Sequence, residues 1–360
     1  MTSGSMNSGK TVLVTGGCGF IGAHFVRHLL TQTDWRVVNL DLLTYAGDLG
    51  RLQGIDTGDR YRFVRGDLAD RGLLKTLFQE EMPRAVVNFA AESHVDRSIL
   101  DPWPFIQTNI AGVQALLEAT RQHGTDRFLQ ISTDEVYGDG EGQPPATEES
   151  SLRPSSPYAA SKAAADLLCL AYRRTFDARV LLLRCSNNFG PFQFPEKLIP
   201  FMIRAALNGD DLPVYGDGGQ RRDWMFVDDA CVAVRAVMEK GALGSVYNAS
   251  TGSLRSNLDV VHAMCDLLAA EGGLNSKELR GRVRFVQDRP GHDRRYEVDA
   301  SRIHRDLGWS PQVSFEAGLQ QTVRWYLANQ TWLKQVTSGD YRAYVEAVYS
   351  REWNSRSRPT

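Results

Sequence analysis

The stretch TVLVTGGCGFIG, residues 11–22, decides the fold that we predict for this chain. A β-branched and apolar run leads directly into Gly16, Gly19 and Gly22, and a helical pattern follows. Glycine permits a tight turn and a close approach of the backbone to a pyrophosphate, and the following helix points its N-terminal N–H groups at the phosphates. Because the glycines stand between a strand and a helix, they predict a dinucleotide-binding loop rather than a plain glycine-rich turn.

Strand and helix signals alternate through the first half of the chain. Apolar runs typical of strands buried on both faces occur at residues 11–14, 37–40, 85–89, 128–131 and 180–183. Helical patterns lie between them at residues 22–31, 73–81, 102–123 and 157–175. This alternation predicts βαβ units and therefore an α/β fold with a doubly wound parallel (Rossmann) sheet.

The second half is more irregular. It holds one helix at 195–208 within a loop-rich segment, a mixed region over 251–312, and an amphipathic helix at 314–329. Residues 224–247 read as helix then strand, which indicates a return to the first domain. We therefore predict a Rossmann domain over 10–188 and 223–250, a smaller mixed α/β substrate-binding lobe over 189–222 and 251–353, and tails at 1–9 and 354–360.

Composition limits the class of protein. The 360 residues are 42% hydrophobic, and 41 basic residues against 43 acidic ones leave a net charge of −2. With no basic stripe we expect no nucleic-acid partner, and with no long apolar run we expect no membrane span. Five widely spaced cysteines without a C-x-x-C motif, and an N-terminus without an apolar signal segment, indicate reduced thiols in a cytoplasmic protein.

Asp41 identifies the cofactor within the dinucleotide class. It closes the second strand 19 residues after Gly22, where a carboxylate accepts hydrogen bonds from the adenosine ribose hydroxyls. Because it would repel a 2′-phosphate, NAD is favoured over NADP, and Arg51 lies too far on to be an obvious phosphate clamp. Asp67 and Leu68 follow the third strand and are placed to meet the adenine, although Asp67 could instead cap the helix at 73–81.

Tyr158 and Lys162 form a candidate catalytic pair. They stand four residues apart at the start of a predicted helix, so they share one face of it. A tyrosine with a pKa of about 10 needs help to act as a base near pH 7. A nearby lysine and the positive nicotinamide ring both favour the phenolate.

A second constellation follows the strand at 128–131. Thr133-Asp134-Glu135 lies at the carboxyl end of that strand, where open α/β sheets bind ligands. Two adjacent carboxylates repel each other, and partial burial adds to this, so one can stay protonated as an acid while the other acts as a base. The alternative is a solvated turn.

These residues belong to a wider resemblance that covers residues 10–353. The chain resembles the extended short-chain dehydrogenase/reductases (the NAD-dependent epimerase/dehydratase family), and within them the dTDP-glucose 4,6-dehydratases. The resemblance rests on residues 16–22, 41–47, 89–98, 133–139, 185–188, 194–200, 222–224 and 288–296. Thr133-Asp134-Glu135 is its most specific part, because the related epimerases usually lack the acid pair and the decarboxylases usually show Thr-Ser-Glu. Cys18 in place of alanine and Leu42 in place of lysine are small departures.

The resemblance implies a reaction and a role for each catalytic residue. Tyr158 would take the proton of the sugar 4-hydroxyl while NAD oxidises C4, and Lys162 would hold the nicotinamide ribose and lower the pKa of Tyr158. Thr133 would bond the 4-oxygen, Glu135 would remove the C5 proton, and Asp134 would protonate the leaving 6-hydroxyl. Elimination of water across C5–C6 and hydride return to C6 would give dTDP-4-keto-6-deoxyglucose, with NAD regenerated.

The resemblance also implies the binding residues. Those for NAD are Gly16, Gly19, Phe20, Ile21, Gly22, Asp41, Leu43, Thr44, Asp67, Leu68, Ala90, Ala91, Ser93, Thr108, Tyr158, Lys162 and Asn188. Those for the nucleotide-sugar are Ser93, Thr133, Asn187, Lys197, Leu198, Pro213, Tyr215, Arg222, Asn257, Arg289 and His292, with Tyr296 and Tyr349 as weaker members. Arginine and lysine suit a diphosphate, and for each of these residues a plain surface position is the alternative.

Other readings remain open. The chain could act on UDP-glucose, or be an epimerase or a decarboxylase, against which Asp134 argues. It could also be a non-catalytic NAD-sensing regulator, against which the complete catalytic set argues. His24 and His28 lack a third ligand, so we expect no metal. Apolar residues beyond one stripe on the helices at 102–123 and 157–175 predict a homodimer through these two helices.

Overall fold

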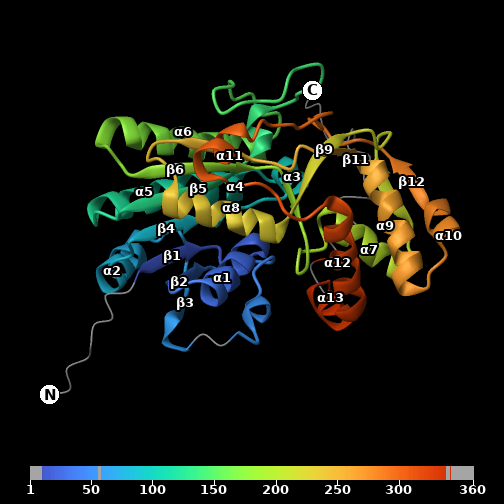
Figure 1. Cartoon of the computed structure of the whole chain (residues 1–360), viewed down its shortest axis with the longest axis horizontal. Helices are drawn as coiled ribbons and strands as arrows, with labels where there is room; N and C mark the ends of the chain where they lie inside the picture. Colours follow the sequence, from blue (N-terminus) through green and yellow to red (C-terminus); the bar gives the residue numbers. More distant parts are fainter. Residues whose placement is uncertain (1–9, 56–57, 338–340, 342–360) are drawn as a thin grey trace, which may run out of the picture.

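A seven-stranded sheet forms the centre of the larger part of the computed structural model (Figure 1), which describes residues 10–55, 58–337 and 341. Its strand order is β10-β6-β5-β4-β1-β2-β3, and every neighbouring pair is parallel. The strands are β1 (Thr11–Thr15), β2 (Arg36–Asp41), β3 (Tyr61–Arg65), β4 (Ala85–Asn88), β5 (Arg127–Thr133), β6 (Val180–Cys185) and β10 (Val246–Ala249). The predicted doubly wound parallel sheet is confirmed.

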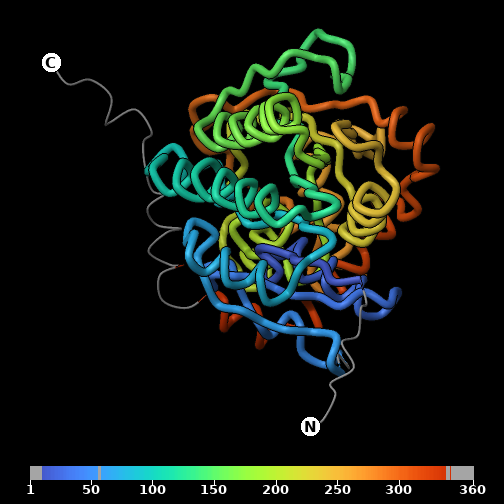
Figure 2. Tube along the Cα trace, turned by 90° about the vertical axis from the view of Figure 1, so that its left-hand side faces the viewer, coloured from blue at the N-terminus to red at the C-terminus, as the bar shows by residue number. Residues whose placement is uncertain are grey.

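Helices cover both faces of this sheet because its strands are apolar on both sides. Along β1, Val12 and Val14 join the hydrophobic cluster of one face, and Leu13 joins that of the other. The first face carries α1 (Phe20–Gln32), α8 (Val227–Lys240) and α11 (Ser301–Leu307). The second carries α2 (Arg71–Glu81), α5 (Val113–Gln122) and α6 (Pro157–Phe176), and Figure 2 shows α5 and α6 side by side.

The order of the strands reverses between β1 and β4. The chain winds outward from β1 through β2 to β3, and then in the opposite direction from β4 through β5 and β6. At such a reversal the connections at the carboxyl ends of the strands leave in opposite directions and open a crevice. The fold therefore places a ligand site where the glycine loop leaves β1.

The predicted helix over 102–123 is interrupted. It consists of α4 (Trp103–Ile106), a π-helical turn (Gln107–Gly112) and α5. Within that turn the side chain of Asn109 bonds both the N–H and the C=O of Glu92 and donates to Ser161 Oγ. The side-chain periodicity gave no sign of the wider turn, which lies at the ligand site, as π-turns often do.

The smaller part has its own hydrophobic cluster and two small sheets. The sheets contain β7 (Asn187–Phe189), β9 (Arg221–Phe226) and β11 (Leu254–Ser256), and β8 (Leu212–Tyr215) with β12 (Val283–Val286). The helices around them are α7 (Leu198–Asn208), α9 (Asn257–Gly272), α10 (Ser276–Gly281), α12 (Phe315–Ala328) and α13 (Gln330–Val336). The predicted helices at 195–208 and 314–329 are α7 and α12.

The return of the chain to the large sheet is confirmed, since α8 packs on it and β10 extends it beside β6. A later segment also returns, because Ile303 of α11 and Trp309 bury their side chains in the cluster that contains α8. The exact division into two lobes stays a prediction.

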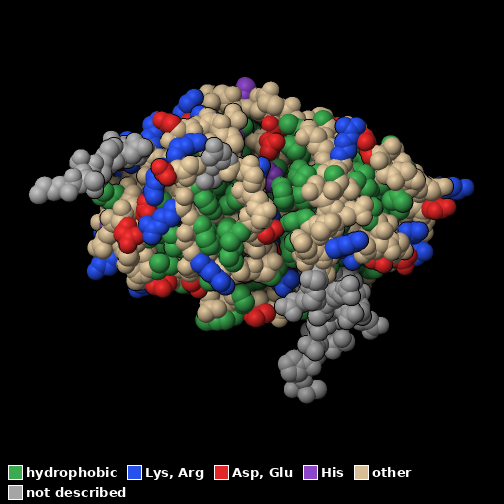
Figure 3. All heavy atoms as spheres, turned by 90° about the horizontal axis from the view of Figure 1, so that it is seen from below, with side chains coloured by type: hydrophobic (Ala, Val, Ile, Leu, Met, Phe, Trp, Pro, Cys, Tyr) green, Lys and Arg blue, Asp and Glu red, His purple; other side chains and the backbone are tan. Residues whose placement is uncertain are grey.

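The surface and the cysteines agree with the composition. Basic and acidic side chains are interspersed over the face drawn in Figure 3. All five cysteines are buried and unpaired. In the described ranges, no helix combines the length and the apolar character that crossing a membrane requires.

Candidate active site

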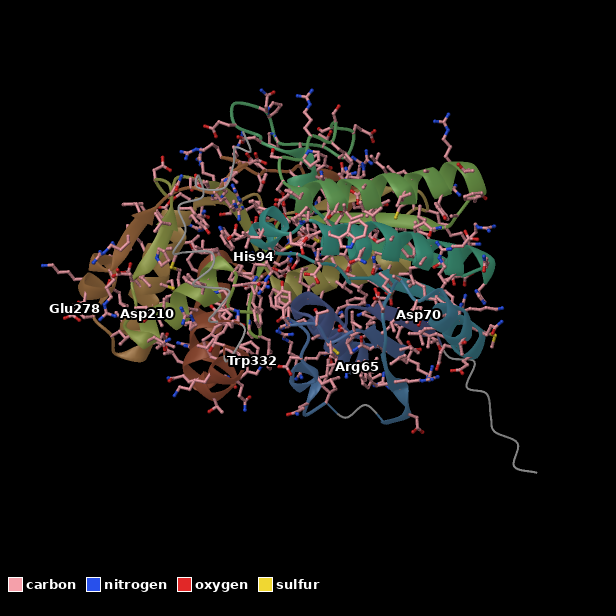
Figure 4. All side chains as sticks on the ribbon, turned by 180° about the vertical axis from the view of Figure 1, so that it is seen from behind. Arg65, Asp70, His94, Asp210, Glu278 and Trp332 are labelled. Atoms are coloured by element: carbon pink, nitrogen blue, oxygen red, sulfur yellow. The ribbon has the colours of Figure 1, made fainter. Side chains whose placement is uncertain are left out.

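A cleft of about 430 Å³ lies at the carboxyl ends of the strands and between the two parts of the molecule. Figure 4 shows His94, one of its lining residues, between the large sheet and the smaller part. The cleft brings together all of the predicted catalytic, cofactor and substrate residues except two. Leu43 does not line it, and Tyr349 lies outside the described residues.

The glycine loop forms one end of the cleft. Gly16 has φ +69°, and a Cβ there would lie 2.5 Å from the backbone nitrogen of Ala90. A Cβ at Gly22 would lie 2.2 Å from the carbonyl oxygen of Gly16. Helix α1 begins with neither a side-chain cap nor an acidic residue in its first turn. Its N–H groups and dipole are therefore open to an anion, and the residues present fit the diphosphate of NAD.

Asp41 occupies the position expected for binding the ribose. Its two carboxylate oxygens accept hydrogen bonds from the N–H groups of Cys18 and Leu43, both at 2.8 Å. The backbone of Leu43 has φ +56°, and it is the N–H of this residue that bonds Asp41. Its side chain does not line the cleft, whereas that of the neighbouring Leu42 does. Asp67 lines the cleft too, while Asp70 caps α2, so the alternative role of Asp67 as that cap is wrong.

The acid pair follows β5 in a short 3₁₀ turn (Asp134–Tyr137). Thr133 caps this turn by accepting the N–H of Glu135, and it lies 3.2 Å from Asp134 Oδ1. Asp134 is only 2% exposed, which excludes the solvated turn. Within the described structure, Asp134 Oδ2 and Glu135 Oε2 are buried without a hydrogen-bond partner. Two unsatisfied carboxylate oxygens in one cleft call for a ligand with hydroxyl groups.

Burial raises the pKa of both carboxyls, but the neighbouring charges act on them in opposite directions. Burial, together with the neighbouring charge of Glu135, raises the pKa of Asp134 to about 8, so Asp134 is a neutral acid at pH 7. Burial also raises the pKa of Glu135, but Arg289, Lys197 and Arg222 oppose that rise. The cations act against protonation of Glu135, and the charge of Glu135 acts against ionisation of Asp134, so Glu135 is the carboxyl better suited to be the base and Asp134 the one better suited to be the acid.

Tyr158 and Lys162 lie in the first turns of α6, which starts at the cap Ser156 with Pro157 as its first residue. Burial and the charges of Glu135 and Asp134 raise the pKa of Tyr158 well above its ordinary value. The Lys162 ammonium donates to the carbonyl of Ile131 at 2.6 Å, beside the acid pair. The lowering of the Tyr158 pKa by Lys162 therefore stays a prediction for the enzyme with its cofactor.

The wall contributed by the smaller part is rich in cations. Arg289 Nη1 lies 2.9 Å from Asp96 Oδ1, and the Tyr215 hydroxyl lies 3.1 Å from the other oxygen of the same carboxylate. The His292 ring bonds Asp288 at 2.6 Å, yet burial lowers its pKa to about 4. His292 is therefore a neutral hydrogen-bonding group at pH 7, while Arg289 carries the charge.

Lys197, Arg222 and Asn187 complete this wall. The Lys197 ammonium donates to the Ser93 carbonyl at 2.6 Å, and Arg222 donates to the Asp293 carbonyl at 2.8 Å. The Asn187 side-chain oxygen is buried without a partner within the described residues. Arg222 is 4% exposed and so is not a surface residue.

Sequence reasoning gave no role to several residues that build the cleft. Asp96 holds both Arg289 and Tyr215, and Glu196 receives Arg97 at 3.1 Å and the Tyr45 hydroxyl at 3.0 Å. Asp96 falls in the stretch 89–98 that carries the resemblance, which was the available signal. Arg51 lines the cleft although its place in the sequence suggested no contact with a ligand.

The parallel sheet, the glycine loop and the Tyr158–Lys162 pair together define a short-chain dehydrogenase/reductase with NAD as its cofactor. A family model described as GDP-mannose 4,6 dehydratase matches residues 13–322. The chain belongs to this family.

Similar proteins share this fold and are enzymes that act on nucleotide-sugars. A dTDP-glucose 4,6-dehydratase of Xanthomonas campestris is 50% identical over 342 residues, covering 92% of this chain and 97% of that protein. One from Escherichia coli K12 is 46% identical over 356 residues, covering 94% and 98%. Among solved structures, the dTDP-glucose 4,6-dehydratase of Streptomyces venezuelae, which contains NAD, has a TM-score of 0.84 at 44% identity, covering 91% and 99%. A UDP-glucose 4-epimerase of Thermus thermophilus with NAD has a TM-score of 0.79 at 31% identity, covering 89% and 99%.

Proposed function

We propose that this protein is a dTDP-glucose 4,6-dehydratase that converts its substrate into dTDP-4-keto-6-deoxyglucose. The observation that carries the proposal is the buried pair Asp134 and Glu135, each with an unsatisfied oxygen, in the same cleft as Tyr158. An epimerase needs no acid–base pair to remove water from C5 and C6, so this pair favours dehydration. Dehydratases named for dTDP-glucose are also the 46–50% identical relatives.

NAD supplies hydride chemistry when bound, by accepting a hydride from the sugar and returning it. The residues that would hold it are the glycine loop, Asp41, Thr108 and Lys162, all of which line the cleft. Tyr158 accepts the proton of the 4-hydroxyl, and Thr133 donates a hydrogen bond to the same oxygen. The oxidation is favoured when Asp134 is neutral, because its negative charge would otherwise oppose the phenolate.

The acid pair then removes water. A 4-ketone makes the C5 proton acidic, and Glu135, whose ionised form Arg289 and Lys197 favour, removes that proton. Asp134 protonates the 6-hydroxyl as it leaves, because its raised pKa keeps it in the acid form. The cleft buries Asp134 Oδ2 and Glu135 Oε2, so bulk water does not compete with the substrate for these two oxygens.

The wall of the smaller part binds the nucleotide and the diphosphate of the substrate. Arg222, Arg289 and Lys197 carry the positive charge that a diphosphate needs, and Asn187 offers a free buried oxygen. Leu198, Pro213, Tyr215 and Asn257 line the end of the cleft where a base would pack. We assign the NAD-binding Rossmann domain to residues 10–188 and 223–250 and the substrate lobe to residues 189–222 and 251–353, with Ser93, Thr133 and Asn187 of the Rossmann domain also contacting the nucleotide-sugar.

One incubation distinguishes this activity from its rivals. The protein is mixed with dTDP-glucose, and the product mass and the reduced cofactor are followed together. Loss of one water without net NADH is the expected result, and an unchanged mass overturns the proposal in favour of an epimerase or a non-catalytic role. UDP-glucose in a parallel reaction measures the preference for the nucleotide.

The pH profile should have a falling limb on its alkaline side. Asp134 must hold its proton to act as the acid, and its raised pKa of about 8 keeps it protonated below that pH and not above it. We therefore expect kcat for dehydration to fall as the pH rises through about 8, and Asp134→Asn to remove that limb. A wild-type rate with no fall between about pH 7 and 9 would contradict the assignment of the acid.

We also propose a homodimer through the helices predicted at 102–123 and 157–175. Apolar side chains stand exposed on α3 (Val95–Leu100), α4 and α6, three helices that contact one another: Leu100, Trp103, Ile106 and Leu167, at 41%, 60%, 42% and 56%. Covering these side chains with a second copy removes apolar area from water.

Leu167→Glu should convert the dimer into a monomer, as measured by light scattering. A charge on a face buried in the dimer loses its hydration without gaining a partner. The control is Phe285→Glu on β12, an equally exposed phenylalanine at 59% in the smaller part, which should leave the dimer intact. A wild-type monomer, or a dimer that survives Leu167→Glu, would refute the proposal.

We place the protein in the cytoplasm because all five of its cysteines are buried and free.

A further inference from the structure

Arg51 is the largest side chain in the described structure that is buried almost completely. It is 1% exposed and lies in the short helical turn Leu49–Leu52, which follows the loop after β2. Its Nη1 donates to the carbonyls of Cys18 at 2.6 Å and of Ala46 at 2.5 Å, and its Nε donates to the carbonyl of Phe192 at 3.1 Å. One guanidinium thus joins three segments of the chain.

Two of these segments belong to the cofactor end of the cleft. Cys18 sits inside the glycine loop, and its own N–H donates to Asp41 Oδ2. Ala46 lies in the loop that follows Asp41, and both Ala46 and Arg51 line the cleft. By binding the two carbonyls through one nitrogen, Arg51 fixes the distance between the loop for the diphosphate and the loop for the adenosine ribose.

The third segment ties the cofactor end to the smaller part. Phe192 has φ +63°, a backbone conformation unfavourable for phenylalanine, and its ring packs 4.4 Å from that of Trp325. The Arg51 guanidinium also lies 5.7 Å from the ring of Trp332, whose indole N–H donates to Asp48 Oδ2 at 2.8 Å. Figure 4 places Trp332 at the edge of the smaller part that faces the first domain.

The buried charge of Arg51 is only partly compensated in the chain alone, because burial lowers the pKa of its guanidinium below its ordinary value. Among the described residues the charges of Asp48 and Asp41 favour its charged form, but neither carboxylate bonds the guanidinium directly, and its Nη2 is buried without a hydrogen-bond partner. Carbonyl dipoles compensate a buried cation only in part, so an anion nearby stabilises it. A dinucleotide brings a diphosphate to the loop that Arg51 supports from behind.

We propose that Arg51 is a positioning residue that determines how tightly the enzyme retains NAD. It holds the glycine loop and the ribose loop in their binding geometry before the cofactor arrives, and its buried charge favours the anionic ligand. The proposal rests on NAD as the resident cofactor, which the reaction neither consumes nor releases.

The test compares Arg51→Met with wild type as purified, before any NAD is added. The NAD content per chain is measured after denaturation, and the rate of NAD loss is measured by dilution into a large excess of a competing dinucleotide. We expect release at least about tenfold faster in Arg51→Met, because three hydrogen bonds to a charged donor are lost. With saturating NAD, kcat should stay within about threefold of wild type, because Arg51 touches no reacting atom.

The matched control is Arg60→Met. Arg60 also donates to two backbone carbonyls, those of Thr33 at 2.7 Å and Leu30 at 2.5 Å, but it does not line the cleft. Both variants lose carbonyl bonds, so both should lower the unfolding temperature of the NAD-free protein. Only Arg51→Met should change NAD content, which separates a role in positioning from general stability.

Arg51→Lys keeps the positive charge. If Arg51→Met does not fold, this variant tests whether Arg51 determines the retention of NAD. A single ammonium cannot span carbonyls on both sides of a guanidinium, so faster NAD release than in wild type is again expected. NAD content and release equal to wild type in the variant that folds would overturn the proposal. A wild-type protein that binds no NAD, even when NAD is added, would instead refute the proposed function.

Discussion

Tyr158→Phe is expected to abolish the first chemical step, lowering the rate of C4 oxidation by at least about 10³-fold. The phenol oxygen is the base for the 4-hydroxyl proton, and phenylalanine keeps the ring in its buried place without that oxygen. The ring packs against Phe105 at 6.3 Å, so the fold should tolerate the change. The measurement is single-turnover formation of reduced cofactor after mixing with dTDP-glucose.

Tyr172→Phe is the matched control for this prediction. Tyr172 lies on the same helix, α6, and bonds Gln114 at 3.0 Å away from the cleft. Its loss should leave oxidation within about twofold of wild type. If Tyr158→Phe were equally active, Tyr158 could not be the base, and the acid pair would have to take over that role.

Asp134→Asn is expected to divide the reaction into two parts. Asparagine has nearly the same shape but cannot give up a proton, so elimination should slow by about 10²- to 10³-fold. Oxidation at C4 should slow much less, because it does not need the acid. Reduced cofactor should therefore accumulate on the enzyme, and rapid mixing with detection of its absorbance should show a rise that decays slowly.

The outcome that contradicts this prediction is equal slowing of both steps. Such a result would mean that Asp134 only shapes the cleft. Asp228→Asn serves as the control, because partial burial and the charge of Asp229 raise the pKa of Asp228 too, but this exposed residue lies on α8 outside the cleft. That variant should follow wild type in both steps.

Local spacing explains why so much of the site could be predicted. The glycine loop needs only its own residues between β1 and α1, and Tyr158 and Lys162 need only one helix to share a face. Asp134 and Glu135 follow one strand directly. Leu43 shows the limit, because a left-handed backbone at that residue turns its side chain from the cleft and presents Leu42 instead.

Long-range contacts explain what was not predicted. The π-helical turn that carries Thr108 and Asn109 depends on bonds from Asn109 to Glu92 and Ser161, which no periodicity reveals. Arg51 looked distant from the cofactor, yet it reaches a carbonyl 141 positions away at Phe192.

The sequence by itself determined the class of fold, the identity of the cofactor and the types of catalytic group. Each of these follows from residues that are neighbours in the chain. Only the tertiary structure decided the protonation of the acid pair and the support of the binding wall. Asp134 is a neutral acid because the folded chain buries it. Arg289 is held at the cleft by a hydrogen bond to Asp96, which lies 193 positions away in the sequence. Burial and distant pairing exist only once the chain has folded, so spacing along the sequence could not reveal them.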